Sequence, residues 1–164
     1  FRVHEETWNE LSDLDRQPFY RIESSDGVLV LAITRNEEFI LVRQFRPALR
    51  RSTIEFPAGS IEEGETPEEA AVRELLEETG YRAGTLRLLG SGHIMMNRYS
   101  ARDYLFMAQD CRVSSQTPNV PDQDVLLLSP TEFKALVTSG GFEHIPALSL
   151  FSLAEWQLGS RLVV

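Results

Sequence analysis

The sequence predicts an α/β fold in which a mixed β-sheet is covered by helices. Two observations predict it. Short runs of branched and aromatic residues, bounded by turn-forming residues, indicate strands in both halves of the chain. Helical patterns follow the strands in the middle of the chain and again near its end. Because strands and helices are interspersed, the pattern favours a layered α/β sandwich over an all-α or all-β fold.

Strand signals dominate the first third of the chain. Residues 1–16 are polar with scattered apolar positions, and we expect an arm or a short strand there. The residues at 24–27 predict a turn, and the polar residues at 35–38 join two apolar runs into a β-hairpin. The predicted strands of this part cover residues 19–23, 28–34, 39–44 and 54–56.

The best-defined element is a helix at residues 67–79. Thr66 is a natural N-cap, Pro67 suits the first helical position, and Glu69 completes a capping box. Gly80 is expected to end the helix as its C-terminal cap. Both ends of this helix are therefore predicted from local chemistry.

The rest of the chain continues the alternation of strands and helices. Apolar runs predict strands at 86–89, 104–108 and 125–128. The Ser-Pro-Thr-Glu sequence at 129–132 predicts a cap leading into a helix over 132–138, and residues 145–158 are predicted to form a closing amphipathic helix.

Composition limits the classes of function. The formal net charge of −9 repels polyanions, so we expect no nucleic-acid partner. The longest wholly apolar run, at 28–33, is too short to span a membrane, and we expect no membrane partner. The single Cys111 cannot form an internal disulfide, which favours a reducing, cytoplasmic location. Because no repeat or linker divides the chain, we expect one domain over 1–164, with 1–20 as a candidate N-terminal arm.

The carboxylates are clustered. Eight of the 25 lie between positions 62 and 78. Glu74, Glu77 and Glu78 are spaced so that a helix places them on one face, where they would repel one another. Such crowding is expected where hard divalent cations bind, although acid-rich helix faces are often merely solvated. Arg73 and Glu65 are the charged residues that we expect to pair and to tie the preceding loop to the helix.

The complete pattern is more specific than the acids alone. Gly59, Glu65 and the run Arg-Glu-Leu-Leu-Glu-Glu-Thr-Gly-Tyr at 73–81 match the Nudix box at every fixed position. On these 23 residues the chain resembles the Nudix hydrolase family. The resemblance implies a Nudix-type α/β/α sandwich with a mixed β-sheet, and a metal-dependent enzyme that cleaves pyrophosphate bonds.

The resemblance also implies roles for individual residues. Glu74 and Glu78 become the principal metal ligands, and Glu77 becomes a further ligand or the base that orients water. The carbonyl of Ala58 often joins the ligands in related enzymes. The implied cofactor is Mg²⁺, which Mn²⁺ can replace. The implied reaction is attack of water on one phosphorus while the other phosphate departs.

The flanking residues indicate the class of substrate. The segments 41–47 and 54–59 resemble the branch of the family that hydrolyses ADP-ribose and other nucleoside diphosphate sugars. In that branch the arginine matching Arg46 commonly contacts the substrate, and Glu55 lies beside the metal site. Arg43 is a further candidate for substrate binding. We therefore expect a small nucleotide substrate that is cleaved to a nucleoside monophosphate and a sugar phosphate.

The chain departs from this branch in two places. A Pro-Gly segment is usual about sixteen residues after the box, whereas this chain has Met-Met-Asn-Arg-Tyr at 95–99. Arg98, Tyr99 and Arg102 thereby become candidates for binding a different sugar or base. The branch often takes its catalytic glutamate from a loop before the last strand, where this chain offers Asp122 as a candidate base.

Several alternatives stay open at this point. The substrate could instead be a dinucleoside polyphosphate, NADH or a nucleoside triphosphate, and a noncatalytic Nudix-fold binding module is a further alternative. Trp8, Phe19 and Tyr20 could stack on a base if the N-terminal arm crosses to a partner subunit, as in dimeric relatives. On that ground we expect a homodimer.

Overall fold

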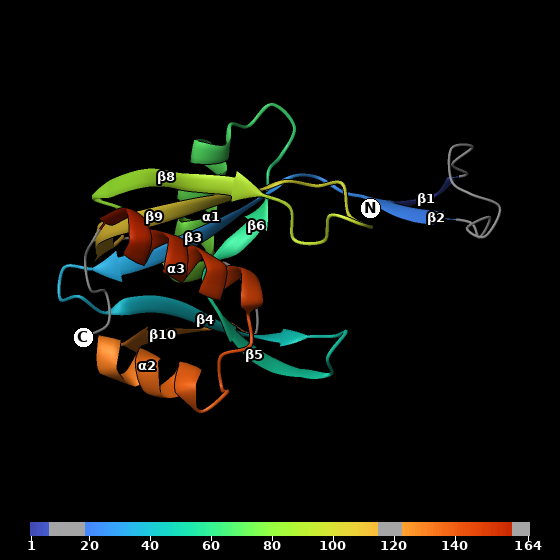
Figure 1. The fold of residues 1–164 in the computed structure, drawn as a ribbon. Helices are drawn as coiled ribbons and strands as arrows, with labels where there is room; N and C mark the ends of the chain where they lie inside the picture. The colour runs from blue at the N-terminus through green and yellow to red at the C-terminus, as the bar shows by residue number, and fades with distance from the viewer. Residues whose placement is uncertain (7–18, 115–122, 159–164) are drawn as a thin grey trace.

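A computed structural model describes residues 1–6, 19–114 and 123–158, and it has an α/β/α architecture (Figure 1). An eight-stranded sheet has the order β10-β4-β3-β9-β7, with β5 on β4, β6 on β3 and β8 on β9. Its strands are β3 (Gly27–Thr34), β4 (Phe39–Arg46), β5 (Arg51–Glu55), β6 (Ala58–Ser60), β7 (Tyr81–Arg82), β8 (Thr85–Gly92), β9 (Asp103–Val113) and β10 (Gln123–Leu128). Strands β3 and β9 are parallel, and the other strand pairs described in this sheet are antiparallel. The predicted mixed sheet is thus confirmed.

Alternation along β3 explains the two covering layers. Val28, Val30 and Ala32 join the cluster that packs on helix α1 (Pro67–Thr79). Their neighbours face the other way, toward α2 (Pro130–Thr138) and α3 (Ile145–Leu158). Because successive side chains of a strand point to opposite faces, a strand buried on both sides is apolar at nearly every position.

Aromatic rings fill the layer under α2 and α3. The ring of Phe133 lies 4.8 Å from that of Phe39, 5.1 Å from that of Phe142 and 5.6 Å from that of Phe56, measured between centroids. Phe133 therefore anchors α2 to the sheet. Of the helices in the described part of the chain, none is both long and apolar enough to cross a membrane.

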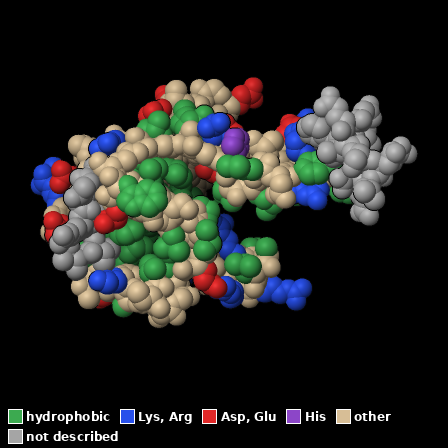
Figure 2. Space-filling model, in the orientation of Figure 1, with side chains coloured by type: hydrophobic (Ala, Val, Ile, Leu, Met, Phe, Trp, Pro, Cys, Tyr) green, Lys and Arg blue, Asp and Glu red, His purple; other side chains and the backbone are tan. Residues whose placement is uncertain are grey.

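An arm projects from this body. Strand β1 (Arg2–Glu6) pairs antiparallel with β2 (Phe19–Glu23) as a separate two-stranded sheet, which extends away from the core in Figure 1. The space-filling view is hollowed between the arm and the β4–β5 end of the body (Figure 2). The sequence predicts the arm, but it does not show where the arm points.

The structure corrects the predicted elements in three respects. The short strands β6 and β7 have no signal in the sequence because they contain only three and two residues. Strand β9 is longer than expected, since it continues through the polar residues Gln109 and Asp110. Helix α3 has the predicted bounds but is not amphipathic: it is apolar around most of its circumference, with Ile145 and Trp156 exposed.

Candidate active site

The helix that carries the clustered acids is fixed at both ends. The side chain of Thr66 accepts a hydrogen bond from the backbone of Glu69, and the Glu69 side chain accepts one from the backbone of Thr66. Gly80 closes the helix in the left-handed conformation at φ 74°. The predicted capping box and C-terminal cap are confirmed, and the register of the acids along α1 is therefore set.

Gly59 allows strand β6 to pass directly over the carboxylate of Glu74. A Cβ atom placed at position 59 would lie 1.9 Å from Glu74 Oε1, so any larger residue would displace this carboxylate. Burial raises the pKa of Glu74, and Arg73, whose Nη1 donates to Glu74 Oε1 at 2.7 Å, opposes the increase. A partly buried carboxylate is thus held against the backbone of the preceding loop.

Glu78 lies one turn further along the same face and is buried, with 7% of its surface exposed. Its Oε2 accepts a hydrogen bond from the Ala58 backbone N–H at 3.0 Å. Burial raises the pKa of Glu78 to about 7, and the nearby charge of Glu74 adds to the increase. A cation beside this carboxylate would favour its charged form.

Arg73 ties the loop to the helix as predicted. Its Nε and Nη2 donate to the two carboxylate oxygens of Glu65, both at 2.9 Å, and Nη2 also donates to the Ser60 carbonyl at 2.9 Å. Hydrogen bonds to Glu65 and Glu74 raise the pKa of Arg73 against the effect of burial. A planar guanidinium can serve these acceptors together, which a lysine cannot do.

Glu77 differs from the other two acids. Its side chain is half exposed, and its Oε2 lies 3.4 Å from Arg73 Nη1. The structure therefore separates the three acids that the helical spacing places on one face. Glu74 and Glu78 turn toward the 58–60 segment, whereas Glu77 remains open to solvent.

These residues fit a hard divalent cation in their chemistry. The donors are all oxygens, and both Glu74 and Glu78 carry pKa values raised by burial. Within the described residues, no three acidic, histidine or cysteine side chains converge on a common point as a ready-made cage. Such a site would therefore complete its coordination with backbone oxygen, water or substrate phosphate.

Arg46 and Glu55 form a two-fold hydrogen-bonded pair near this loop. Arg46 Nε donates to Glu55 Oε1 at 2.8 Å, and Nη2 donates to Oε2 at 2.6 Å. Burial pushes the pKa of Glu55 upward, but hydrogen bonds from Arg46 and Thr53 outweigh it and leave the pKa lowered. Glu55 thus stays ionised and fixes the arginine side chain.

A cavity of about 250 Å³ lies between Arg46 and the box loop. Its lining includes Arg46, Ala58, Gly59, Tyr99 and His144. We call it the loop cavity. It brings together residues from β4, β6, the 93–102 connection and the start of α3, which lie far apart in the sequence.

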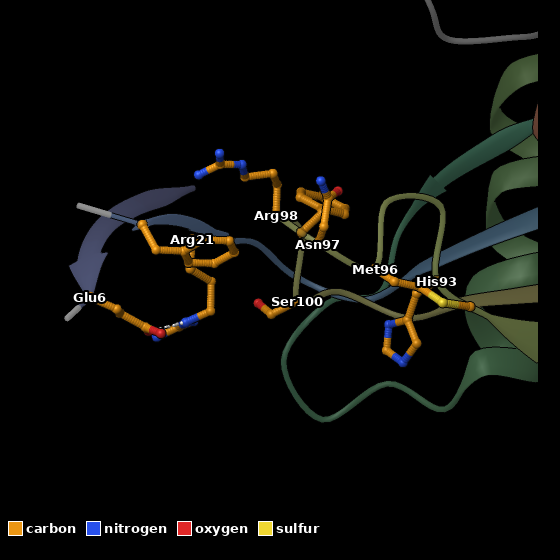
Figure 3. Close-up of a pocket in the computed structure, with 9 residues that line it drawn as sticks. Glu6, Arg21, His93, Met96, Asn97, Arg98 and Ser100 are labelled. Atoms are coloured by element: carbon orange, nitrogen blue, oxygen red, sulfur yellow. Dashed lines mark hydrogen bonds and ion pairs between the residues drawn. The ribbon is translucent and has the colours of Figure 1, made fainter. Parts of the chain in front are cut away.

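The other predicted substrate residues lie in two places. Arg43 Nη1 is 3.8 Å from Asp124 Oδ2 at the exposed β4–β10 edge, and Arg43 does not line the loop cavity. Arg98 lies between the arm and the body, with its guanidinium 4.5 Å from the centre of the Phe19 ring (Figure 3). Asp122 and Trp8 lie outside the described residues.

The 95–100 segment attaches the arm to the body. The backbone of Ile22 donates to the Arg98 carbonyl at 2.6 Å and accepts from Ser100 at 3.0 Å. A cavity of about 320 Å³ between the two is lined by Phe19, Arg98 and Tyr99 among others (Figure 3). Tyr99 thereby touches both this cavity and the loop cavity.

Two titratable lining residues are missing from the sequence-based predictions. Asp103 begins β9 and His144 directly precedes α3, and both line the loop cavity. Neither belongs to a motif. Only the packing of the last helix against the sheet brings His144 to the box loop, so the sequence carried no signal for it.

Comparison with known proteins shows the family of this chain. The NUDIX domain model matches residues 24–148. ADP-ribose pyrophosphatase of Bacillus subtilis (strain 168) is 34% identical over 142 residues, which cover 86% of this chain and 77% of that protein. ADP-sugar pyrophosphatase of Mus musculus is 52% identical over 64 residues, which cover 37% of this chain and only 29% of that protein.

A solved structure has the same fold. The crystal structure of an ADP compounds hydrolase superposes with a TM-score of 0.77 at 24% identity, covering 96% of this chain and 92% of that one. At this identity the likeness concerns the fold alone. It confirms the predicted α/β/α sandwich.

Proposed function

The chain belongs to the Nudix hydrolase family, and we propose that it hydrolyses the pyrophosphate bond of a nucleoside diphosphate sugar such as ADP-ribose. The products are a nucleoside monophosphate and a sugar phosphate. The observation that carries the proposal is the placement of Glu74 and Glu78 against the Ala58 and Gly59 backbone, beside the loop cavity. The relation to the Bacillus ADP-ribose pyrophosphatase over most of both chains supports the choice of substrate class.

Members of this family generally use divalent metals. For this chain we propose Mg²⁺, which Mn²⁺ can replace, with Glu74, Glu78 and the Ala58 carbonyl as ligands and with Glu77 as a further ligand or as the base. When bound, the cation supplies charge neutralisation for the diphosphate and a more acidic water. The buried pair Glu74 and Glu78 gives the site its negative charge, and Arg73 keeps the helix and the loop in register.

The half-exposed Glu77 is our candidate for the residue that orients or deprotonates the attacking water, because its carboxylate is open to solvent. Asp122 remains the second candidate for this role. Either residue would act by accepting a proton from water, and neither needs to contact the nucleoside.

Arg46 is positioned to bind the diphosphate. The pair with Glu55 uses Nε and Nη2 of Arg46, so that Nη1 can donate to a substrate phosphate. Glu55 acts by orienting this arginine. We place the nucleoside near Arg98 and Tyr99, in the cavity between the arm and the body, and Arg43 at the outer edge of the substrate site.

We further propose one domain over residues 1–164, a cytoplasmic location and a homodimer. A lone two-stranded hairpin is marginally stable, and Phe1, Val3 and Tyr20 on the arm are exposed. Phe45, on β4, and Leu49, in the β4–β5 connection, are exposed as well. A second copy would cover both surfaces.

The test is a panel of nucleotides incubated with the purified protein and Mg²⁺. We expect release of a nucleoside monophosphate from ADP-ribose or another nucleoside diphosphate sugar. The substitution Glu78→Gln should lower kcat at least about 100-fold while the protein stays folded, since it removes a buried ligand charge. Glu68→Gln is the matched control, because Glu68 is an exposed glutamate in the first turn of the same helix. Full activity of Glu78→Gln would rule out the assigned ligand, and no hydrolysis of any diphosphate sugar would rule out the substrate class.

A further inference from the structure

A second cavity adjoins the loop cavity. It measures about 300 Å³, and the two share the lining residues Ile94, Asp103 and Pro146. Its surface is largely apolar, with Leu105 and Ile145 in the remaining lining, which also includes His93 and Ser149. We call it the side cavity. The joint volume of the two cavities lies within the range of small-molecule sites, which run from roughly 300 to 1,000 Å³.

Two buried polar atoms at these cavities lack a hydrogen-bond partner. Within the described residues, Asp103 Oδ2 and His144 Nδ1 are buried and unpaired. Asp103 lines both cavities, and His144 lines the loop cavity. Buried polar groups are nearly always satisfied, so an unpaired acceptor and an unpaired ring nitrogen at one cavity indicate a ligand that pairs with them.

The surroundings of Asp103 do not supply a partner. Asp26 and His93 are its titratable neighbours: Oδ1 of Asp26 already accepts from the Arg102 backbone at 2.8 Å, and Nδ1 of His93 lies 2.9 Å from the Ala101 carbonyl. A Cβ atom at Gly27 would lie 2.6 Å from Asp103 Oδ1, so the glycine leaves room for this carboxylate. Burial and the charge of Asp26 raise the pKa of Asp103, and His93 opposes the increase. Keeping an acid here destabilises the protein without a ligand.

The ring of His144 also has a nitrogen that is free to bond a ligand. Its Nδ1 lies 4.0 Å from Glu55 Oε2, too far for a hydrogen bond, and Glu55 is already occupied by Arg46 and Thr53. Burial lowers the pKa of His144 and keeps the ring neutral at pH 7. A neutral imidazole offers one donor and one acceptor.

We infer that Asp103 and His144 recognise the hydroxyl groups of the sugar that is attached to the diphosphate. This inference rests on the proposed function, since it names the residues that select the sugar. Hydroxyls both donate and accept, which suits a carboxylate beside a neutral imidazole. The loop cavity borders Ala58 and Gly59, so the sugar would lie one linkage from the bond that is broken.

The charge of the site sets the class of substrate. Asp103 and Asp26 repel a third phosphate at this position, whereas a neutral polyhydroxylated group meets no such penalty. The site therefore favours nucleoside diphosphate sugars over nucleoside triphosphates and dinucleoside polyphosphates. The apolar side cavity accommodates the carbon face of the sugar.

The experiment measures binding without hydrolysis. Calorimetry gives the dissociation constants of α,β-methylene ADP-ribose and of α,β-methylene ADP, which lacks the sugar. Their ratio reports the contribution of the sugar. Wild-type protein should bind α,β-methylene ADP-ribose more tightly than α,β-methylene ADP. In Asp103→Asn and in His144→Phe this ratio should fall about tenfold, as expected for losing one hydrogen bond in a buried site.

Two controls separate recognition from folding. Asp110→Asn makes the same change at an exposed position of the same strand and should keep the wild-type ratio. Asp103→Asn should unfold at the wild-type temperature or above it, because it removes a buried charge that faces Asp26. His144→Asn keeps a hydrogen-bonding side chain. Its preference for the ligand with the sugar should therefore lie between those of His144→Phe and the wild-type protein.

Equal weakening of both ligands in the two variants would place these residues at the diphosphate and overturn the inference. So would wild-type protein that binds the two ligands equally. Failure of the proposed function has a different signature, because wild-type protein with Mg²⁺ would then leave ADP-ribose intact even where the binding ratio shows a sugar site.

Discussion

The loop cavity is bordered by two regions that are built in opposite ways. On one side lie the 58–65 loop and α1, where the carboxylates of Glu65, Glu74 and Glu78 all accept protein hydrogen bonds. On the other side lies the 93–103 connection, which has no regular strand or helix before β9. There Met96 is 85% exposed, and Asp103 keeps an unpaired buried oxygen.

This difference separates two tasks. Groups that position a reacting bond must be held before the substrate arrives, which a capped helix and a guanidinium network achieve. Groups that recognise the variable part of a substrate need unused hydrogen-bonding capacity, which a protein-only network would consume. The acids of the 58–65 loop and α1 accordingly bond to other protein groups. The 93–103 connection keeps a buried polar atom for a ligand.

Among changes that leave the carboxylates themselves in place, the largest expected effect comes from Gly59→Ala. The added methyl would collide with the Glu74 carboxylate, and because that carboxylate ends a flexible side chain, it would be displaced rather than unfold the loop. We expect kcat to fall about 100-fold with little change in unfolding temperature, since misplacing a reacting group by an ångström has such effects. Steady-state kinetics and thermal unfolding check both parts.

Gly64→Ala is the matched control in the same loop. Gly64 has φ 82° and nothing within 4 Å of the position of its Cβ, so the methyl meets backbone strain but no active-site group. We expect a loss of about 1 kcal/mol in the free energy of unfolding and near-normal kcat. An equal loss of stability in both variants would show that Gly59 is required for its backbone conformation and not for its contact with Glu74.

The box region could be predicted in detail because its rules are local. Thr66, Glu69 and Gly80 predict the ends of α1 from capping chemistry, and the Arg73 pair with Glu65 follows from the motif. The exposed position of Glu77 could not be predicted, because spacing gives the face of a helix but not the hydrogen bonds that turn each side chain.

The second largest effect is expected from Arg73→Lys. A lysine keeps the charge but cannot bridge Glu65, Glu74 and the Ser60 carbonyl together. We expect kcat/KM to fall about 10- to 100-fold, the range typical of residues that support metal ligands. Arg87→Lys, at an exposed arginine on β8, should be neutral. Wild-type kinetics for Arg73→Lys would show that a positive charge alone is enough to keep the 58–65 loop in place against α1.

The opposite region shows why the rest of the site was beyond sequence reasoning. Asp103 and His144 are 41 positions apart in the chain, and only the parallel pairing of β9 with β3 and the packing of α3 bring them to one cavity. The sequence did single out Arg98 and Tyr99 by their departure from the family pattern. It placed neither of them against the arm, because that contact depends on tertiary structure.

The smallest effect is expected from Arg98→Gln, which tests whether the arm takes part in binding. Arg98 contacts the Phe19 ring and donates to the Tyr20 carbonyl at 3.3 Å, so its loss should loosen the 95–100 segment from β2. A cation–π contact at an exposed site contributes about 0.5–1 kcal/mol, which corresponds to a rise in KM of roughly two- to fivefold. The box is untouched, so kcat should stay near the wild-type value. Arg112→Gln, at an exposed position on β9, should change neither constant. A fall in kcat at constant KM would mean that the two regions are not separate and that the arm helps to position the reacting bond.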